Sequence, residues 1–293
     1  MPRLTTRLSS LCLTLAAAGA AAPLAPARAA ESAAETSPAR VLDLTYDVYL
    51  GGLHIFTFDV DMMLQPDRYR VMAEGETRGM MDWLYAWDVR LAAEGSDADG
   101  RIAPHRYVVE SAWQSEQRSL ELGFAAEGRY DLQRDPPPEP DPDVDSRLPV
   151  SLPPGIVDPL SLALAASRSL AETGRCDQTL QVFDGQRRYD LFVRHVDTAI
   201  LPPSDYSIYD GPAVRCSFRV ERISGFRKDR RQGGQGDGAP PLLWVAEIRA
   251  DAPPLPVRYE GQIALGSIVV HLTGAEVRSV PGGLEAEELG AAE

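Results

Sequence analysis

The chain has 293 residues and 44% of them are hydrophobic, which is enough apolar material for the core of one large domain or two average ones. This composition excludes a chain that is disordered overall. The formal net charge of −14 repels nucleic acid over long range, so we expect no nucleic-acid partner.

Residues 1–30 have the features of a secretory signal peptide. Arg3 and Arg7 form a basic start, and residues 11–24 are rich in Ala and Leu. This apolar run is shorter than the roughly 20 residues of a membrane-spanning helix. The small residues that follow predict cleavage after Ala27, Ala29 or Ala30. We therefore expect an exported, periplasmic protein that does not span the membrane once the signal peptide is removed.

The first predicted strands follow a short leader. Residues 31–40 are mostly small, and we expect them to be disordered. Residues 42–50 then alternate apolar and polar side chains, which is typical of a half-buried strand, and the pattern resumes over 56–64. Because Gly51 and Gly52 stand between the two runs, the sequence predicts a β-hairpin.

Short alternating runs continue along the chain and are separated by turn residues. Residues 79–84 have apolar side chains at helical spacing, so we expect one helical turn there and then a strand that ends near Ala93. Further strands are predicted over about 69–73, 102–113, 117–124 and 128–134. This spacing predicts a mainly β fold, with a curled antiparallel sheet or a barrel-like β-spiral, and argues against βαβ units.

One helix has both ends marked in the sequence. Asp158 is a side-chain cap, Pro159 fits the first helical position, and Gly174 is a typical stop. We therefore expect a single helix over about 159–172 that packs against the sheet.

Three segments are poor in side chains that could fill a core. Residues 135–149 are rich in Pro and Asp, and residues 228–241 are rich in Gly and charged residues. We expect both to be flexible insertions in a single β-rich domain over 41–275. Residues 276–293 are predicted to form a disordered acidic tail.

The region after the helix is predicted to contain a disulfide. Two alternating runs flank Asp184-Gly185, which suits a tight hairpin. If Cys12 is lost with the signal peptide, Cys176 and Cys216 remain as an even pair in an oxidising compartment. A bond between them would close a loop of about 40 residues and contribute roughly 4 kcal/mol of stability. Two separate buried thiols are the alternative.

The sequence contains no recognised catalytic motif. Neither the Gly-x-Ser-x-Gly signature of a hydrolase nor the glycine-rich phosphate loop is present. The histidines are too far apart to form a motif, and they are His54, His105, His195 and His271. We therefore expect no cofactor, no metal and no catalytic residue. The many carboxylates still leave a hydrolase with a paired-carboxylate site as an open alternative.

Two groups of side chains are candidates for contact with a ligand. The first is an aromatic group that could line an apolar cavity, with core or interface packing as the plainer interpretation: Trp83, Tyr85 and Trp87. The second is Arg187 and Arg188 beside Asp184, which could hold an anion. Charges at a solvated hairpin end are the commoner arrangement, so we expect that one here.

Three segments together resemble a known family. They are Tyr49-Leu50-Gly51-Gly52-Leu53, Asp158-Pro159-Leu160-Ser161 and Val182-Phe183-Asp184-Gly185-Gln186-Arg187-Arg188-Tyr189-Asp190-Leu191. The set resembles, over roughly residues 41–275, the exported bacterial family known as domain of unknown function 3108. The resemblance implies a periplasmic, β-rich, curled or barrel-like single domain. It implies no activity, so no catalytic residue can be transferred.

These observations favour a non-enzymatic periplasmic protein of the cell envelope. We expect it to bind an apolar ligand such as a lipid, or an envelope protein, inside or along the curled sheet. A structural or interaction protein without a small ligand is the first alternative. An envelope hydrolase with an unrecognised site is the second.

Overall fold

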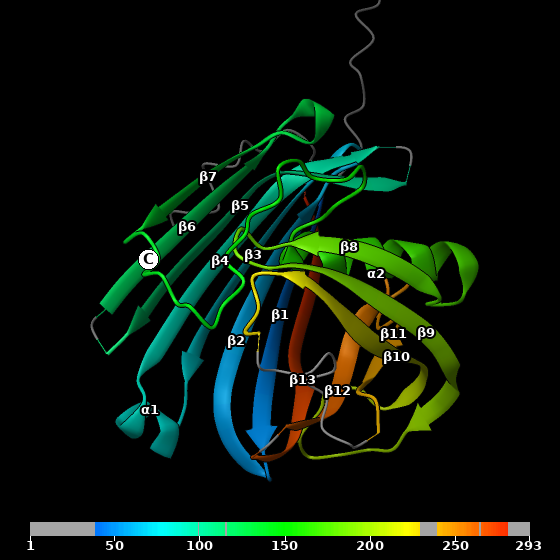
Figure 1. The fold of residues 1–293 in the computed structure, drawn as a ribbon. Coiled ribbons are helices and arrows are strands. Elements are labelled where there is room, and N and C mark those ends of the chain that lie inside the picture. The colour runs from blue at the N-terminus through cyan, green and yellow to red at the C-terminus, as the bar shows by residue number, and fades with distance from the viewer. Residues whose placement is uncertain (1–38, 99, 115, 229–238, 264, 281–293) are drawn as a thin grey trace, which may run out of the picture. The chain divides into compact units, whose positions relative to one another are not determined.

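The computed structural model describes residues 39–280 except for residues 99, 115, 229–238 and 264. These residues form one antiparallel sheet of thirteen strands (Figure 1). The strands are β1 (Ala39–Leu50), β2 (Leu53–Leu64), β3 (Arg68–Thr77), β4 (Trp87–Ala98), β5 (Arg101–Trp113), β6 (Glu116–Phe124), β7 (Tyr130–Asp135), β8 (Gln178–Phe183), β9 (Arg188–Leu201), β10 (Gly211–Ser224), β11 (Leu242–Ala246), β12 (Leu255–Ile263) and β13 (Gly266–Val280). The predicted mainly β fold is therefore confirmed.

The order of the strands follows from two meanders joined at the centre of the sheet. The order is β7-β6-β5-β4-β3-β2-β1-β13-β12-β11-β10-β9-β8, so every neighbour is a sequence neighbour except the pair β1 and β13. The predicted hairpin between β1 and β2 is present. Gly51 and Gly52 have φ of 58° and 86°, a left-handed region that glycine adopts without steric cost.

The sheet curls, but its two edges do not pair with each other (Figure 1). The segment before the helix lies between β7 and β8 and bonds to both sides. The Leu152 amide donates to the Gly128 carbonyl (2.8 Å), and Val157 forms a parallel bridge with Val182 of β8. The rings of Tyr130 and Phe183 also meet edge to face across this gap, at 5.3 Å between centroids. Side chains and one extended segment therefore join edges that backbone pairing leaves open.

Helix α2 (Pro159–Thr173) packs against the sheet, as the sequence predicts for about 159–172. Asp158 caps it by accepting hydrogen bonds from the Leu160 and Ser161 amides, both at 2.9 Å. Gly174 ends the helix in the left-handed conformation, with φ of 67°. The buried face presents Ser161, Leu164, Ser167 and Leu170.

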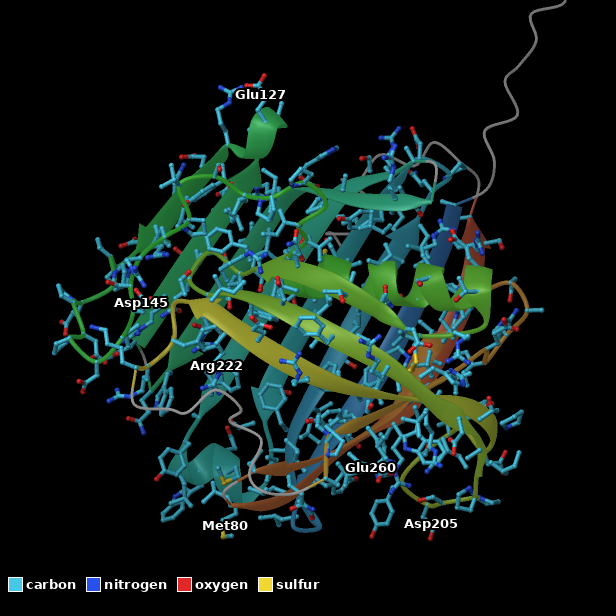
Figure 2. The ribbon with its side chains drawn as sticks, turned by 45° about the vertical axis from the view of Figure 1, so that its right-hand side comes forward. Met80, Glu127, Asp145, Asp205, Arg222 and Glu260 are labelled. Carbon is cyan, nitrogen blue, oxygen red and sulfur yellow. A yellow bond between two sulfur atoms is a disulfide. The ribbon has the colours of Figure 1, made fainter. Side chains whose placement is uncertain are left out.

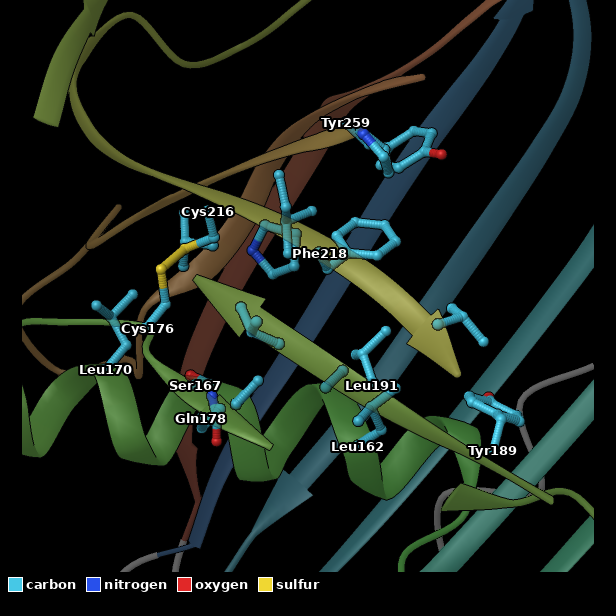
Figure 3. Close-up of a pocket in the computed structure, with 18 of the residues that line it drawn as sticks. Leu162, Ser167, Leu170, Cys176, Gln178, Tyr189, Leu191, Cys216, Phe218 and Tyr259 are labelled. Atoms are coloured by element: carbon cyan, nitrogen blue, oxygen red, sulfur yellow. A yellow bond between two sulfur atoms is a disulfide. The ribbon is translucent and has the colours of Figure 1, made fainter. Parts of the chain in front are cut away.

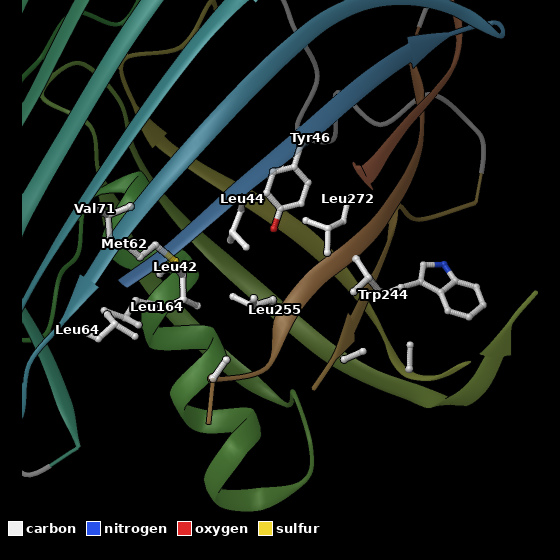
Figure 4. Close-up of a cluster of buried hydrophobic side chains, with 14 of the residues drawn as sticks. Leu42, Leu44, Tyr46, Met62, Leu64, Val71, Leu164, Trp244, Leu255 and Leu272 are labelled. Atoms are coloured by element: carbon white, nitrogen blue, oxygen red, sulfur yellow. The ribbon is translucent and has the colours of Figure 1, made fainter. Parts of the chain in front are cut away.

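The main core lies between this helix and the centre of the sheet (Figure 4). Leu164 of α2 is 1% exposed and belongs to the same cluster as Leu42, Leu64, Leu255 and Leu272. Fully burying a leucine side chain contributes roughly 1.5–3 kcal/mol. The helix is thus held by the same apolar contacts that join the two meanders.

Two predicted boundaries are corrected. Strand β13 extends to Val280, so the residues from 276 to 280 belong to the sheet and not to a disordered tail. Ala39 and Arg40 belong to β1 and not to the leader. Both extensions have one cause, which is that the start of β1 pairs with the end of β13. The alternating pattern within either strand does not show that the other strand is its partner. The predicted signal peptide at residues 1–30 lies outside the described residues, as do residues 229–238 and 281–293.

Two short helices lie between strands. The predicted helical turn at 79–84 is observed as α1 (Met80–Leu84), and a short turn, Ala126–Gly128, precedes β7. The proline-rich segment after β7 is hydrogen bonded to the end of β10. The Asp145 amide donates to the Phe226 carbonyl (2.9 Å), and the Gly225 amide donates to the Asp145 carbonyl (2.7 Å). The flexibility of this segment stays a prediction.

Candidate functional site

The predicted pair of cysteines forms a disulfide in the wall of the interior. Cys176 and Cys216 have Cα atoms 6.2 Å apart, within the usual range for a disulfide. Both residues are buried and pack with Leu170, Val193 and Val245. The bond therefore joins the start of β8 to β10 beside the end of α2.

A cavity of about 700 Å³ lies next to this disulfide, and we call it the cystine cavity (Figure 3). Leu162 and Leu170 line it from α2, and Leu191 and Phe218 line it from β9 and β10 (Figure 3). Its volume falls in the range of small-molecule sites, which runs from roughly 300 to 1,000 Å³. The lining is predominantly apolar, with a few polar side chains.

A second cavity of about 430 Å³ adjoins the first, and we call it the apolar cavity. Side chains of β2 such as Phe58 and Val60 line it, together with Leu91 of β4. Ala163 and Tyr259 line both cavities, so the two spaces share α2 and β12 as walls. Small side chains on the helix thus leave room where the sheet curls past it.

Four polar side chains of the cystine cavity lie near the β8–β9 hairpin. Arg222 lies close to the C-terminal end of β10 (Figure 2) and pairs in register with Tyr189 of β9. Arg187 and Asp184 of the hairpin complete the group. Burial, together with the nearby charge of Asp184, raises the pKa of Tyr189 to about 12, so its hydroxyl stays protonated near neutral pH. This end of the cavity therefore combines two guanidinium groups with a neutral phenol.

The two candidate arginines of the hairpin end in different places. Arg188 is buried and pairs with Asp190 at 2.5 Å, which corrects the expectation of a solvated charge. Arg187 is exposed and also lines the cystine cavity. The alternation of β9 explains the split, because consecutive side chains point to opposite faces of a strand.

The aromatic group that could line a cavity, or more plainly pack in the core or an interface, lies at the surface of the described chain. Trp83 is 83% exposed, and Tyr85 and Trp87 are also exposed. None of the three lines the cystine cavity or the apolar cavity. Trp87 contacts Phe56, which does line the apolar cavity, with 5.2 Å between ring centroids. These aromatics therefore sit with α1 next to one end of the apolar cavity, and they do not form its wall.

The outer face of β2 to β7 carries a group of charged side chains. A groove there is lined by six carboxylates, Asp59, Glu74, Glu76, Asp88, Glu110 and Asp135. Arg90 of the same groove lies 3.2 Å from Glu74. Within the described residues, no group of three or more His, Cys, Asp and Glu side chains is arranged to hold a metal ion. None of the helices in the described part is long and apolar enough to cross a membrane.

Two polar residues of the cystine cavity were not identified from the sequence, Arg222 and Gln178. On β10 the inward side chains before Arg222 are Phe218 and Val220, so a charged residue stands at a position where the alternating pattern of the strand places apolar side chains. Gln178 likewise lies on the same face of β8 as the buried Val182. A polar residue at an apolar position of the alternating strand pattern is the sequence signal that could have identified both residues.

Comparison with known proteins assigns no activity to the chain. A search of curated proteins finds no match. A similar solved structure is the crystal structure of a beta-barrel-like protein of domain of unknown function DUF1849 from Brucella abortus. It shares 13% sequence identity at a TM-score of 0.48, and the match covers 83% of this chain and 99% of that chain. The family model described as "Protein of unknown function (DUF3108)" matches residues 45–273. The chain therefore belongs to the DUF3108 family.

Proposed function

We propose that the chain is an exported protein of the bacterial cell envelope that binds an apolar, chain-like ligand in its interior. The observation that carries the proposal is the pair of adjoining cavities, of about 700 and 430 Å³, beside α2. The signal-peptide features of residues 1–30 support export to the periplasm. The role is that of a binding protein and needs no catalytic residue.

The chemistry of the walls supports an apolar ligand. Leu191 and Phe218 of the cystine cavity, and Phe58 and Val60 of the apolar cavity, offer water no hydrogen-bond partner. Hydrocarbon that replaces water there gains about 0.8 kcal/mol for each buried methylene. Two neighbouring cavities that share lining residues suit a flexible acyl chain better than a compact rigid molecule.

The helix supports the same conclusion. Ala163 lies on α2 at the junction of the two cavities and remains exposed within them. The adjacent turn carries Ala166, which also lines the cystine cavity. Because alanine side chains are short, the helix closes the core at Leu164 and leaves open space on its neighbouring face.

The test is the binding of N-phenyl-1-naphthylamine, a neutral dye whose fluorescence rises in apolar sites. We expect the protein to bind the dye and dodecanol to displace it. In Ala163→Phe the new ring occupies the junction of the cavities, and we expect affinity for the dye to fall by about tenfold or more.

The matched control lies on the same helix. Ala171 is exposed and lines neither cavity, so Ala171→Phe adds the same ring and should leave dye binding unchanged. The proposal fails if the wild-type protein does not bind the dye. It also fails if Ala163→Phe, with an unchanged circular dichroism spectrum, binds the dye as the wild type does.

A further inference from the structure

We infer that the ligand is an anionic amphiphile, whose acidic head lies against Arg222 while its hydrocarbon tail fills the cystine cavity. The head is a carboxylate or a phosphate. The inference rests on the proposed function, because it names the chemistry of the ligand that the cavities are proposed to hold.

Two nitrogen atoms in the wall of the cystine cavity lack an acceptor. Nη1 of Arg222 and Nε2 of Gln178 are buried, and neither has a hydrogen-bond partner in the described part of the chain. A buried donor without a partner costs stability, so such groups are normally paired. Both atoms are donors. They lie at different ends of the cavity, because Gln178 pairs with Val193 near the disulfide, whereas Arg222 pairs with Tyr189 beside the β8–β9 hairpin. A head group that satisfies Arg222 must bring acceptor atoms, which an acidic head does and an amine does not.

Arg222 is also free of an ion pair with any carboxylate of the described segments, as is Arg187. Their guanidinium groups both lie over the ring of Phe226, at 5.2 Å and 5.8 Å from its centroid. The ring holds the two cations at one end of the cavity while leaving their N–H groups available. The planar fork of a guanidinium matches the oxygens of a carboxylate or a phosphate.

The acid next to this pair is already engaged. Asp184 is the one carboxylate that the structure places in the lining of the cystine cavity, and it accepts hydrogen bonds from the Gln186 amide (2.8 Å) and the Arg187 amide. Two guanidinium groups against one carboxylate make the local charge positive. The net charge of −14 opposes this only at longer range, because charges beyond about 8 Å are largely screened at physiological salt.

The path for the tail begins directly beside Arg222. The inward side chains that precede it on β10 are Val220, Phe218 and then Cys216 of the disulfide. At about 3.3 Å per residue, the strand runs roughly 20 Å from Arg222 to the disulfide. The cavity thus has a cationic end and a long, mostly apolar stretch in which Gln178 is a polar side chain near the disulfide, and this is the pattern of a single-chain amphiphile.

The inference is tested with three probes that separate the head from the tail. Dodecanoate has both, dodecanol has the tail with a neutral head, and acetate has the head alone. Each competes with N-phenyl-1-naphthylamine at neutral pH, below the micellar concentration. We expect dodecanoate to bind at least about tenfold more tightly than dodecanol, and acetate not to displace the dye.

Three variants locate the preference. Arg222→Gln should lower the affinity for dodecanoate to that for dodecanol and leave dodecanol binding unchanged, while Arg222→Lys should keep part of the preference. Arg219 lies on the same strand, is exposed and stacks on Phe192 at 4.3 Å without lining the cavity. Arg219→Gln is therefore the control for loss of one positive charge, and it should behave as the wild type.

The outcomes separate this inference from the proposed function. Equal affinity for dodecanoate and dodecanol, or a preference that survives Arg222→Gln, overturns the inference but leaves apolar binding intact. Displacement by acetate as effective as by dodecanoate identifies a site for free anions and also overturns it. Binding of neither twelve-carbon probe overturns both. Unchanged dodecanol binding in Arg222→Gln shows that this variant is folded.

Discussion

The two interior cavities share α2 as a wall yet differ in polarity. The apolar cavity is lined almost entirely by hydrocarbon. The one cation among its described lining residues, Arg258, forms an ion pair with Glu260 at 2.8 Å, although its Nε has no well-aligned hydrogen bond. The cystine cavity contains Arg222 and Gln178, whose buried donor atoms have no acceptor among the residues described. A protein tolerates unpaired donors poorly unless something else bonds them. If the proposed ligand binds here, the difference assigns its acidic head and the adjoining tail to the cystine cavity, and it leaves the apolar cavity to hydrocarbon alone.

The disulfide should have the largest effect on this arrangement, because it closes a loop with a sequence separation of 40 in the wall of the cystine cavity. Replacing both cysteines by alanine should lower the free energy of unfolding by about 4 kcal/mol. Urea denaturation measures this. A loss below about 1 kcal/mol would contradict the assigned role, and treating the wild type with reductant should reproduce the loss.

The ion pair between the C-terminal half of α2 and the sheet should have the second largest effect on the free energy of unfolding. Arg168 of the helix pairs with Asp97, whose side chain is 2% exposed. Arg168→Ala leaves that carboxylate buried without its partner, so the free energy of unfolding should fall by about 3 kcal/mol. Arg175 pairs with Asp177 at the exposed surface, and Arg175→Ala is the control that should have little effect. Equal effects of the two variants would show that Asp97 finds water or another donor.

The cap of α2 should matter somewhat less and should affect both cavities. Asp158 is buried and holds the first turn through the Leu160 and Ser161 amides. Asp158→Ala should cost about 2 kcal/mol of unfolding free energy, because the amides lose their acceptor. Asp158→Asn keeps an acceptor oxygen and should recover part of it. Thermal unfolding of both variants measures this effect. A melting temperature of Asp158→Ala equal to that of the wild type would exclude a capping role for the carboxylate.

The smallest expected effect on the free energy of unfolding comes from Asp61, on the outer face of the sheet behind the apolar cavity, and it depends on pH. Partial burial and a hydrogen bond with Asp43 raise the pKa of Asp61 to about 6, above its ordinary value near 4. The folded protein therefore binds this proton more tightly than the unfolded chain, and the raised pKa costs stability above pH 6. That cost disappears as pH falls from 6 towards 4.

Replacing Asp61 by asparagine should remove this dependence. At pH 7 the variant should be more stable than the wild type by less than about 1 kcal/mol, because solvent screens these charges. At pH 4 the two proteins should be equally stable. Urea denaturation at both pH values measures the difference, and a larger difference at pH 4 than at pH 7 would contradict the sign.

The sequence predicted what depends on local patterns. The alternation around Gly51 and Gly52 predicted the first hairpin, and Asp158 with Gly174 predicted the helix to within a residue at its end. The pairing of β1 with β13 was not predictable, because its partners are more than 200 positions apart. The site depended on the same long-range closure. Trp83 was a candidate because it is aromatic, but it is exposed and lines neither cavity. Arg222 was not a candidate, because only the folded sheet places β10 beside α2 and so brings this side chain to the cystine cavity.

The most direct test of an occupied interior is native mass spectrometry of the protein purified from its own cells without detergent. We predict a species heavier than the polypeptide by the mass of one acyl-chain molecule, which denaturation releases and which Ala163→Phe lacks but Ala171→Phe retains. A wild-type protein that has only the mass of its polypeptide, and that takes up no added dodecanoate or dodecanol, would contradict ligand binding in these cavities.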